Sequence, residues 1–330
     1  MLIKPRPPRE KIVNLKGRRF LFRVEDSNAP ADYLKYEELR QAIWQCPQDH
    51  LPGGRNMMCE NFCHDGSSLF IGVFAEDEKG SLSVSGERLV GFSYGYVGLK
   101  DKSAGFRASD NLQFYSQYNA VREDHRGFGL GIWLKEFQRE QVRRGFGLKT
   151  ITCTYDPLTA VNAYRNIRHF GMEVLGYRAD VYGEFGGLLN RLDVPRDRFS
   201  VSWDLDQKSR RLEEEVDESS LPGRCVIESE RLRVSGKNGE VEIEVIAQVR
   251  PGLDGEVLFV EIPADFYLLL RETDVGDPKV RKIPVDWRTE TRQVFQSLLE
   301  RGYRVTDFFR TKPAPRRYFY VLRRPESRKA

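Results

Sequence analysis

The chain contains little cysteine, no long apolar run and no large excess of either charge. Its 330 residues include five cysteines, an odd and sparse set that argues against a disulfide framework. Its longest apolar runs, such as 69–75, fall far short of the roughly 18 residues of a membrane-spanning helix, so we expect no transmembrane segment. Lys and Arg number 53 and Asp and Glu 49, with both signs mixed, so composition alone indicates no nucleic-acid partner.

The first ten residues, MLIKPRPPRE, contain charge and proline but no apolar core or small-residue cleavage site. This composition predicts that no export signal is present. We therefore expect a cytoplasmic protein without a membrane partner.

One cysteine and histidine cluster has spacings that can hold zinc: Cys46 and His50, followed by Cys59, Cys63 and His64. The alternative is that Cys59 and Cys63, four residues apart, are small buried residues on one helix face. The usual two-residue spacer of zinc sites is missing, so helix packing is favoured and no metal is expected.

The length predicts two domains, and the clearest break is the charged, aperiodic run RRLEEEVDESS at 210–220. We predict four parts: an N-terminal arm at 1–18, a first domain at 19–208, an acidic linker at 209–222 and an α+β C-terminal domain at 223–330.

Hydrophobic periodicity predicts both strands and helices in the first domain, and hence an α/β (α+β) fold. The predicted strands are 19–25, 69–75, 89–97, 111–121, 149–155, 174–182 and 199–205; helices are predicted from 30, at 57–62, at 130–144 and from 157 to 171. In the C-terminal domain, strands are predicted at 240–248, 256–262 and 317–322, and an amphipathic helix at 287–301. The segment 294–305, a helix followed by Gly302 and an aromatic strand, is similar to 163–174, which suggests a degenerate internal half-repeat.

The most informative segment is VREDHRGFGLG at 121–131, a basic, glycine-rich turn between a strand and a helix. Gly127, Gly129 and Gly131 allow close approach of a ligand, and the helix start presents unpaired N–H groups, a combination that binds pyrophosphate. A dinucleotide fingerprint would need glycine where Leu134 stands, and the Gly-Lys-Ser/Thr of a nucleotide-binding P-loop is absent.

The pattern Arg126-x-x-Gly129-x-Gly131 after a strand resembles the acyl-coenzyme A signature of the GNAT superfamily of N-acetyltransferases. The segments TYDPLTAVNAYRNIRHFGMEV at 154–174 and YGEFGGLLNRLDVPRDRFSVSWDL at 182–205 resemble a long bacterial branch of predicted acetyltransferases. Some members of that branch act in pathways that acylate the α-amine of amino acids, including succinylation. The remaining third of the chain resembles only the C-terminal extension of this branch.

This resemblance implies a mixed central sheet flanked by helices. It also implies an N-acyltransferase that uses acetyl-CoA or another acyl-CoA, such as succinyl-CoA, as co-substrate. The acceptor would be a primary amine of a small molecule such as an amino acid. The family's cofactor contacts correspond to Arg126, Gly127, Phe128, Gly129, Leu130 and Gly131 at the turn, and to Asn119 and Val121 on the preceding strand, whose backbone would bind pantetheine and polarise the thioester.

The sequence departs from the family at the catalytic acid, because Ile167 stands where many relatives have tyrosine. Tyr164, one turn earlier, is the candidate acid, although helix packing explains it equally well. Asp156 is the candidate general base, with a helix N-cap as the alternative. We expect His125 to be a solvated loop residue and Cys153 to be a buried core thiol.

The resemblance also indicates where the acceptor binds, on the central strands and before the last strand. The candidate residues are Tyr94, Tyr96, Tyr115, Gln117, Asn190, Asp197 and Arg198. Arg198 would pair with a substrate carboxylate, and a surface salt bridge is its alternative role.

A competing class is a regulatory protein that binds acyl-CoA without catalysis, consistent with the missing tyrosine and the large extension. The basic tail at 310–330, with aromatic residues at 318–320, suits RNA or membrane contact, but a terminal strand is favoured. We therefore expect no nucleic-acid partner. The extension would shape the acceptor site or form a homodimer interface.

Overall fold

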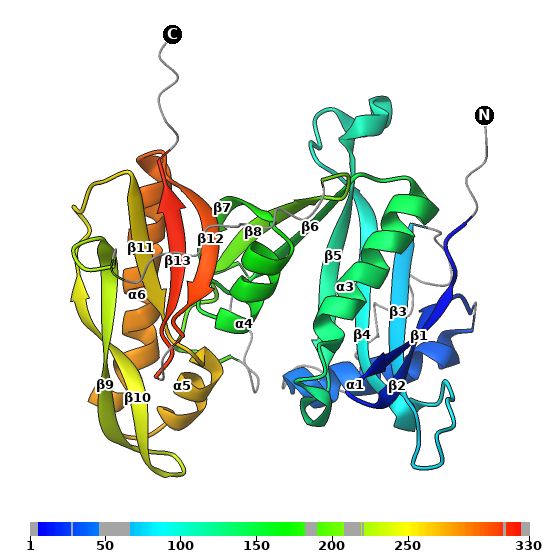
Figure 1. The fold of residues 1–330 in the computed structure, drawn as a ribbon, viewed down its shortest axis with the longest axis horizontal. Helices are drawn as coiled ribbons and strands as arrows, with labels where there is room; N and C mark the ends of the chain where they lie inside the picture. Colours follow the sequence, from blue (N-terminus) through cyan, green and yellow to red (C-terminus); the bar gives the residue numbers. More distant parts are fainter. Residues whose placement is uncertain are drawn as a thin grey trace. The chain divides into compact units, whose positions relative to one another are not determined.

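The structure, a computed structural model, describes residues 6–27, 29–45, 67–181, 190–207, 219, 221–312 and 315–324. The chain forms two compact units, of which unit 1 is Met1–Cys153 with Asp204–Asp206 and unit 2 is Thr154–Trp203 with Gln207–Ala330 (Figure 1). Most of the predicted linker at 209–222 lies outside the described residues, so the predicted domain boundaries stay a prediction. Among the described helices, none combines the length and the apolar character needed to cross a membrane.

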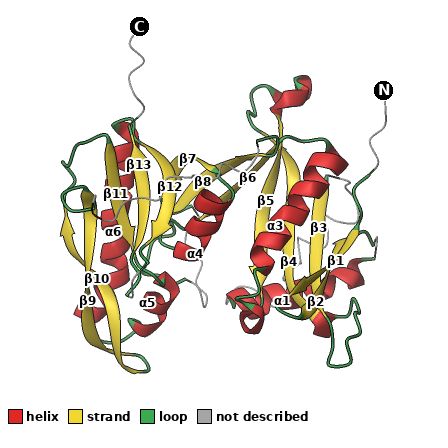
Figure 2. Cartoon of the chain, viewed as in Figure 1, coloured by secondary structure: helices red, strands yellow, loops and turns green. Residues whose placement is uncertain are grey.

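Unit 1 consists mainly of antiparallel strands with two long helices (Figure 2). Its strands are β1 (Glu10–Leu15), β2 (Arg18–Glu25), β3 (Ser68–Ala75), β4 (Leu89–Leu99) and β5 (Leu112–Val121), and β6 (Thr150–Tyr155) continues into unit 2. Its helices are α1 (Leu34–Trp44) and α3 (Leu130–Glu140), the latter extended by a π-helical turn, Gln141–Phe146. Short 3-10 turns occur at Pro30–Tyr33, Gly86–Arg88, Gly105–Arg107, Ser109–Asn111 and Glu123–His125.

Unit 2 contains the remaining elements in two groups. The first group is α4 (Ala160–Ala163), its π-helical continuation Tyr164–His169, β7 (Glu173–Arg178) and β8 (Arg198–Asp204). The second group is β9 (Cys225–Gly236), β10 (Gly239–Val249), β11 (Val257–Ile262), α5 (Phe266–Glu272), α6 (Pro278–Glu300), β12 (Arg304–Arg310) and β13 (Tyr318–Arg323).

The strands form two sheets. The larger has the order β1-β2-β3-β4-β5-β6-β8-β7, antiparallel from β1 to β5 and parallel between β5 and β6. The smaller has the order β10-β9-β11-β13-β12. The predicted mixed sheet flanked by helices, followed by a smaller α+β part, is therefore confirmed.

The core of unit 1 is aromatic. Tyr36 of α1 lies with its ring centroid 4.4 Å from that of Phe70 on β3, which stacks on Phe92 of β4 at 5.6 Å. Burial of each such ring contributes roughly 1.5–3 kcal/mol. Gly72 is required here, because a Cβ would come within 2.7 Å of the Tyr36 hydroxyl.

The strands and helices differ in detail from those expected. The predicted N-terminal arm at 1–18 contains the strand β1, which was not predicted and pairs with β2 along its whole length. The helix predicted at 287–301 begins at Pro278, because the carboxylate of Asp277 accepts a hydrogen bond from the N–H of Lys279 (2.8 Å) and proline suits the first helical position. The strand β9 and the helix α5 were not predicted.

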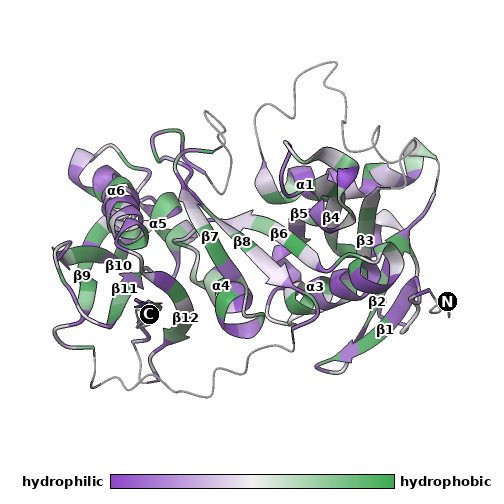
Figure 3. Cartoon of the chain, turned by 90° about the horizontal axis from the view of Figure 1, so that it is seen from above, coloured by the Kyte–Doolittle hydropathy of each residue, from purple (hydrophilic) through white to green (hydrophobic). Residues whose placement is uncertain are grey.

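Hydropathy explains why α6 was recognised only in part. Strands such as β3 are largely hydrophobic, whereas α6 carries many hydrophilic residues (Figure 3). Its buried positions nevertheless include polar ones, among them Arg288 and Thr291. A periodicity of apolar residues alone therefore shows only part of the face that α6 buries.

Candidate active site

The turn predicted to bind pyrophosphate joins β5 to α3 in unit 1. Gly127 and Gly129 have φ angles of +85° and +81°, in the left-handed region that favours glycine. A Cβ built on either glycine would meet no atom within 4 Å. Glycine is therefore needed here for the backbone angle, and the space beside the turn is open to a ligand.

The N-cap residue of α3 is Gly129, and no side chain in the described part of the chain caps this helix start. The N–H of Ile132 already donates to the carbonyl of Gly129 (3.0 Å), so the N–H groups of Leu130 and Gly131 are the helix-start donors that have no acceptor one turn back; they lie at the positive end of the helix dipole. Arg126 beside them is 54% exposed and lies 3.5 Å from Glu123, a loose surface pair. These groups fit an anion such as pyrophosphate.

The second half of β5 has one edge without a strand partner in the described part of the chain. β5 pairs with β6 only through Phe114 and Tyr115, whereas its pairing with β4 continues to Val121. Beyond Tyr115, the described part of β6 gives β5 no strand partner, and the backbone of 119–121 on that edge suits an extended ligand. This arrangement suits the predicted pantetheine contacts at Asn119 and Val121, which stay a prediction.

Asn119 connects this strand to the start of α3. Its side-chain amide donates to the carbonyl of Gly131 (3.5 Å), while its Oδ1 is buried without a hydrogen-bond partner in the structure. An unsatisfied buried acceptor is costly. It is an acceptor that an amide N–H of a bound cofactor would satisfy.

A bulge in β5 brings four tyrosines to one face of the sheet. Tyr94 lies opposite Tyr118, and Tyr96 opposite Tyr115, because Gln117 is an extra residue in β5. Gly95 permits the bulge, since a Cβ would come within 2.4 Å of the Tyr115 carbonyl oxygen. The tyrosine rings lie 5.6–6.4 Å apart, and the Gln117 side chain is exposed. The structure thus brings together the predicted acceptor residues of unit 1.

His125 is not solvated, contrary to the expectation from the sequence. It is 4% exposed and packs against Phe20 and Phe128, with ring centroids 6.4 and 6.3 Å away. Its Nδ1 hydrogen-bonds the carboxylate of Asp124 (2.7 Å). The imidazole is therefore buried against aromatic side chains next to the turn. The composition of the loop did not predict this burial.

The charge of Asp124 should persist in acid. A hydrogen bond from Arg122, with a further one from His125, lowers the pKa of Asp124 to about 2. A depressed carboxyl pKa contributes stability that is present above the unfolded value near 3.8 and is lost as the pH falls through about 2. We expect an NMR titration of the Asp124 carboxyl carbon to show a midpoint near pH 2 in wild type and a higher midpoint in Arg122→Gln. The contribution to stability should be small, because the side chain is 60% exposed.

A buried polar network holds α3 against the sheet. Lys135 is 2% exposed and donates to the hydroxyl of Ser116 beside the bulge (2.7 Å). Gln138 donates to the hydroxyl of Ser93 on β4 (2.7 Å). These contacts keep the helix that begins at the turn in register with β5. In the sequence, the only sign of these contacts is that Lys135 and Gln138 are polar residues on the apolar face of the predicted helix.

In unit 2, Asp156 follows β6 and is held in ion pairs. Its carboxylate receives two hydrogen bonds from Arg288, at 2.8 and 2.5 Å, and one from the N–H of Leu158 at 2.9 Å. Arg198 lies 3.6 Å away. The carboxylate thus closes a turn before α4, while the N-cap of that helix is Thr159. The role of Asp156 as a base stays a prediction.

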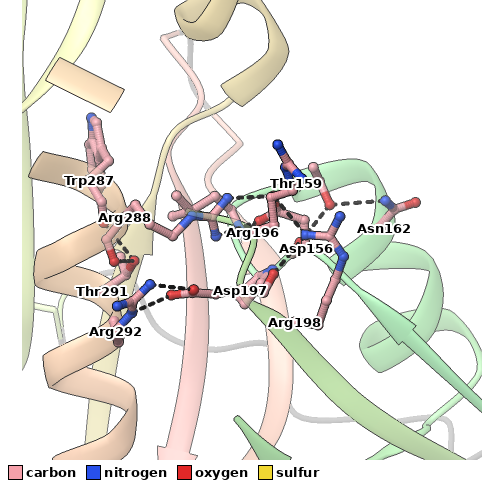
Figure 4. Close-up of polar contacts among 12 residues, drawn as sticks. Asp156, Thr159, Asn162, Arg196, Asp197, Arg198, Trp287, Arg288, Thr291 and Arg292 are labelled. Carbon is pink, nitrogen blue, oxygen red and sulfur yellow. Dashed lines mark hydrogen bonds and ion pairs between the residues drawn. The ribbon is translucent and has the colours of Figure 1, made fainter. Parts of the chain in front are cut away.

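Asp197 lies beside Arg198 and is fully buried. It accepts two hydrogen bonds from Arg292 (2.8 and 2.6 Å) and one from the Tyr177 hydroxyl (2.6 Å), as Figure 4 shows for Arg292. Burial raises the pKa of Asp197, but these hydrogen bonds outweigh burial and lower it overall. Burial and the charge of Asp197 raise the pKa of Tyr177. Sequence reasoning missed the arginines of α6, which lie about 100 residues away along the chain.

Tyr164 is 38% exposed and its ring lies 5.5 Å from the guanidinium of Arg310. Its role as an acid stays a prediction.

Asn190 is half-buried, and Cys153 is buried, as expected. The cluster from Cys46 to His64 lies outside the described residues, and within the described ones no group of three metal-binding side chains occurs.

No family model and no curated protein matches the chain. Among solved structures, it is similar to Arabidopsis thaliana NAA60 in complex with acetyl-CoA, with 14% identity, a TM-score of 0.39, and coverage of 57% of this chain and 99% of that one. It is also similar to the Escherichia coli ribosomal-protein-S18-alanine N-acetyltransferase, with 14% identity, a TM-score of 0.38, and coverage of 58% and 98%. The ribosomal-protein-S5-alanine acetyltransferase from Vibrio fischeri gives 14%, 0.37, and coverage of 57% and 94%.

The turn sequence is similar to the acyl-coenzyme A signature, and the described strands form a mixed sheet flanked by helices, with no side-chain cap at the start of α3.

Proposed function

We propose that this chain is an acyl-CoA-dependent N-acyltransferase. The observation that carries the proposal is the start of α3, which has no side-chain cap and follows two left-handed glycines in the turn after β5. Bound acyl-CoA would supply the activated acyl group. The acceptor would lose its ammonium proton to solvent and attack the thioester carbonyl as the free amine; the C–N bond forms, the C–S bond breaks, and coenzyme A leaves as a thiolate while the excess proton of the new amide nitrogen is released. Gly127–Gly131 and Arg126 would hold the pyrophosphate, and a backbone N–H of 118–121 would stabilise the charge that develops on the thioester oxygen.

The proposal is tested by incubating the full chain with acetyl-CoA or succinyl-CoA and a panel of primary amines. Release of coenzyme A thiol and the mass of the product are measured. Amine-dependent release with an acylated amine is expected. Binding of coenzyme A without turnover on any amine would instead support the alternative, a regulatory acyl-CoA-binding protein, which the engagement of Asp156 with Arg288 favours. Absence of binding would overturn both.

The proposed acceptor is a small primary amine that carries a carboxylate, such as an amino acid. Support comes from Arg198, whose side chain is 15% exposed beside Asp156 and donates to the Asp197 carbonyl (2.8 Å). A guanidinium held in this way is suited to a planar carboxylate.

Replacing Arg198 with glutamine should raise the KM for a carboxylate-bearing amine about 10- to 100-fold, the equivalent of a lost charge-assisted hydrogen bond. The KM for acetyl-CoA should change less than about twofold, because the cofactor groups lie elsewhere. The matched control is the same amine without its carboxylate, whose KM should not respond to the substitution. Equal effects on both amines would contradict this role.

A further inference from the structure

Two segments of the chain repeat one order of elements. The first runs from β6 through α4 and β7 to β8, and the second from β11 through α5 and α6 to β12 and β13. The strand orders β5-β6-β8-β7 and β9-β11-β13-β12 correspond position by position. In both, the first strand of the segment has a parallel neighbour, β5 or β9.

The two segments also share details that topology does not require. Each helix ends at a glycine with left-handed φ, Gly171 at +63° and Gly302 at +87°, two residues before the next strand. That strand then has a bulge after its second residue, between Val174 and Gly176 in β7. The bulge in β12 lies at the corresponding place, after Val305.

The pairs that follow the bulges correspond as well. Tyr177 lies opposite Phe199, and Phe308 lies opposite Tyr320. The rings of each pair are 5.5 and 4.9 Å apart. An aromatic cross-strand pair therefore occupies the same position in both segments.

The packing between the two segments is reciprocal. The π-helical turn after α4 contacts β12, while α6 contacts β7, and β7 contacts β12. Phe199 and Tyr320 occupy equivalent positions and touch each other, with ring centroids 5.6 Å apart. Such contacts between equivalent residues are typical of a two-fold arrangement.

The segments differ in what precedes them. β5 leads through the glycine turn into α3, whereas β9 returns as the antiparallel strand β10 in a hairpin before β11. The described residues 225–262 contain no helix and no counterpart of the 127–131 turn. The second segment therefore lacks the groups that fit pyrophosphate.

The helix of the second segment supplies cations to the first. Arg288, 1% exposed, holds Asp156, and Arg292 holds Asp197 next to Arg198 (Figure 4). Both pairs use two hydrogen bonds, which fix orientation as well as distance. The residues that α6 orients are therefore the candidate base, Asp156, and the acceptor candidate Asp197, which precedes Arg198.

We propose that residues 257–323 are a second copy of the segment 150–204 that has lost its cofactor-binding half and now positions the first copy's acceptor residues through Arg288 and Arg292. The positioning part rests on the proposed function, whereas the duplication does not. Arg288 and Arg292 are positioning residues that act through Asp156 and Asp197.

Because the second copy has lost its cofactor-binding half, the proposal predicts one acyl-CoA site per chain. Native mass spectrometry of the full chain with excess acetyl-CoA should show one bound molecule per chain, and two would overturn the loss of a second site. The duplication also predicts that Phe199→Leu and Tyr320→Leu lower one shared melting transition by amounts that do not add in the double variant, because each substitution removes one of two rings that touch. Separate transitions, or strict additivity, would contradict the reciprocal packing.

The positioning role is tested with Arg292→Met and Arg292→Lys. We expect Arg292→Met to raise the acceptor KM about tenfold with the acetyl-CoA KM within about twofold, and Arg292→Lys to restore part of the loss. The matched control, Lys282→Met on the same helix, has a 67% exposed side chain and should leave both constants unchanged. An unchanged acceptor KM in Arg292→Met would overturn the positioning role. Absence of transfer by wild type would overturn the proposed function, while the melting measurements test the reciprocal packing of the two copies independently of acetyl-CoA.

Discussion

Gly129→Val is expected to weaken acetyl-CoA binding at least about 100-fold, measured by isothermal titration calorimetry. Valine strongly disfavours the φ of +81° at this position, so the turn must change its path at the start of α3. The N–H groups would then no longer converge on one anion. Loss of charge-assisted hydrogen bonds, each about 1.5–3 kcal/mol, accounts for a change of this size.

Gly147→Val is the matched control. Gly147 has a φ of +72° and, like Gly129, a Cβ position with no atom within 4 Å, but it lies at the other end of the helix. Both variants should lose stability by about 1–2 kcal/mol from backbone strain. Only Gly129→Val should lose acetyl-CoA binding. Equal affinity of the two variants for acetyl-CoA would show that the turn is not part of the binding site.

Arg288→Met should lower the free energy of unfolding by about 3 kcal/mol, at the low end of the range for breaking a buried ion pair. The loss leaves the carboxylate of Asp156, 12% exposed, with only Arg198 and the Leu158 N–H nearby. Methionine preserves much of the volume, so a cavity is not the main cause. The measurement is urea unfolding at neutral pH.

The double variant Asp156→Asn with Arg288→Met separates charge from packing. It removes both charges, so it should be more stable than Arg288→Met alone. If the double variant were less stable than either single variant, the ion pair would not be the source of the effect.

The turn and its strand and helix were predictable because their determinants are local. Gly127 and Gly129 permit backbone angles that other residues disfavour, and the apolar spacing from Leu130 to Phe137 defines the buried face of α3. The strands β3 and β8 were likewise visible as runs of apolar and aromatic residues. Local conformation and burial periodicity act over a few residues, which is the range that a sequence pattern covers.

The bulge at Gln117 and the burial of His125 could not be predicted from local sequence patterns. The bulge depends on the approach of Gly95 to the Tyr115 carbonyl, and His125 is buried because Phe20 from another strand covers it. Charge composition also did not show which ions would pair. A carboxylate that looked like a free base, Asp156, is held by a guanidinium 132 residues further along the chain.

Patterns along the chain were enough to predict a mixed α/β fold, a glycine turn before a helix and a faint similarity between two helix ends. Only the tertiary structure decided which partners hold Asp156 and Asp197, and that Gly171 and Gly302 end corresponding helices before corresponding bulges. The reason is physical. Backbone angles and hydrophobic periodicity are set by neighbours along the chain, whereas ion pairing, burial and strand register are set by residues that folding brings together.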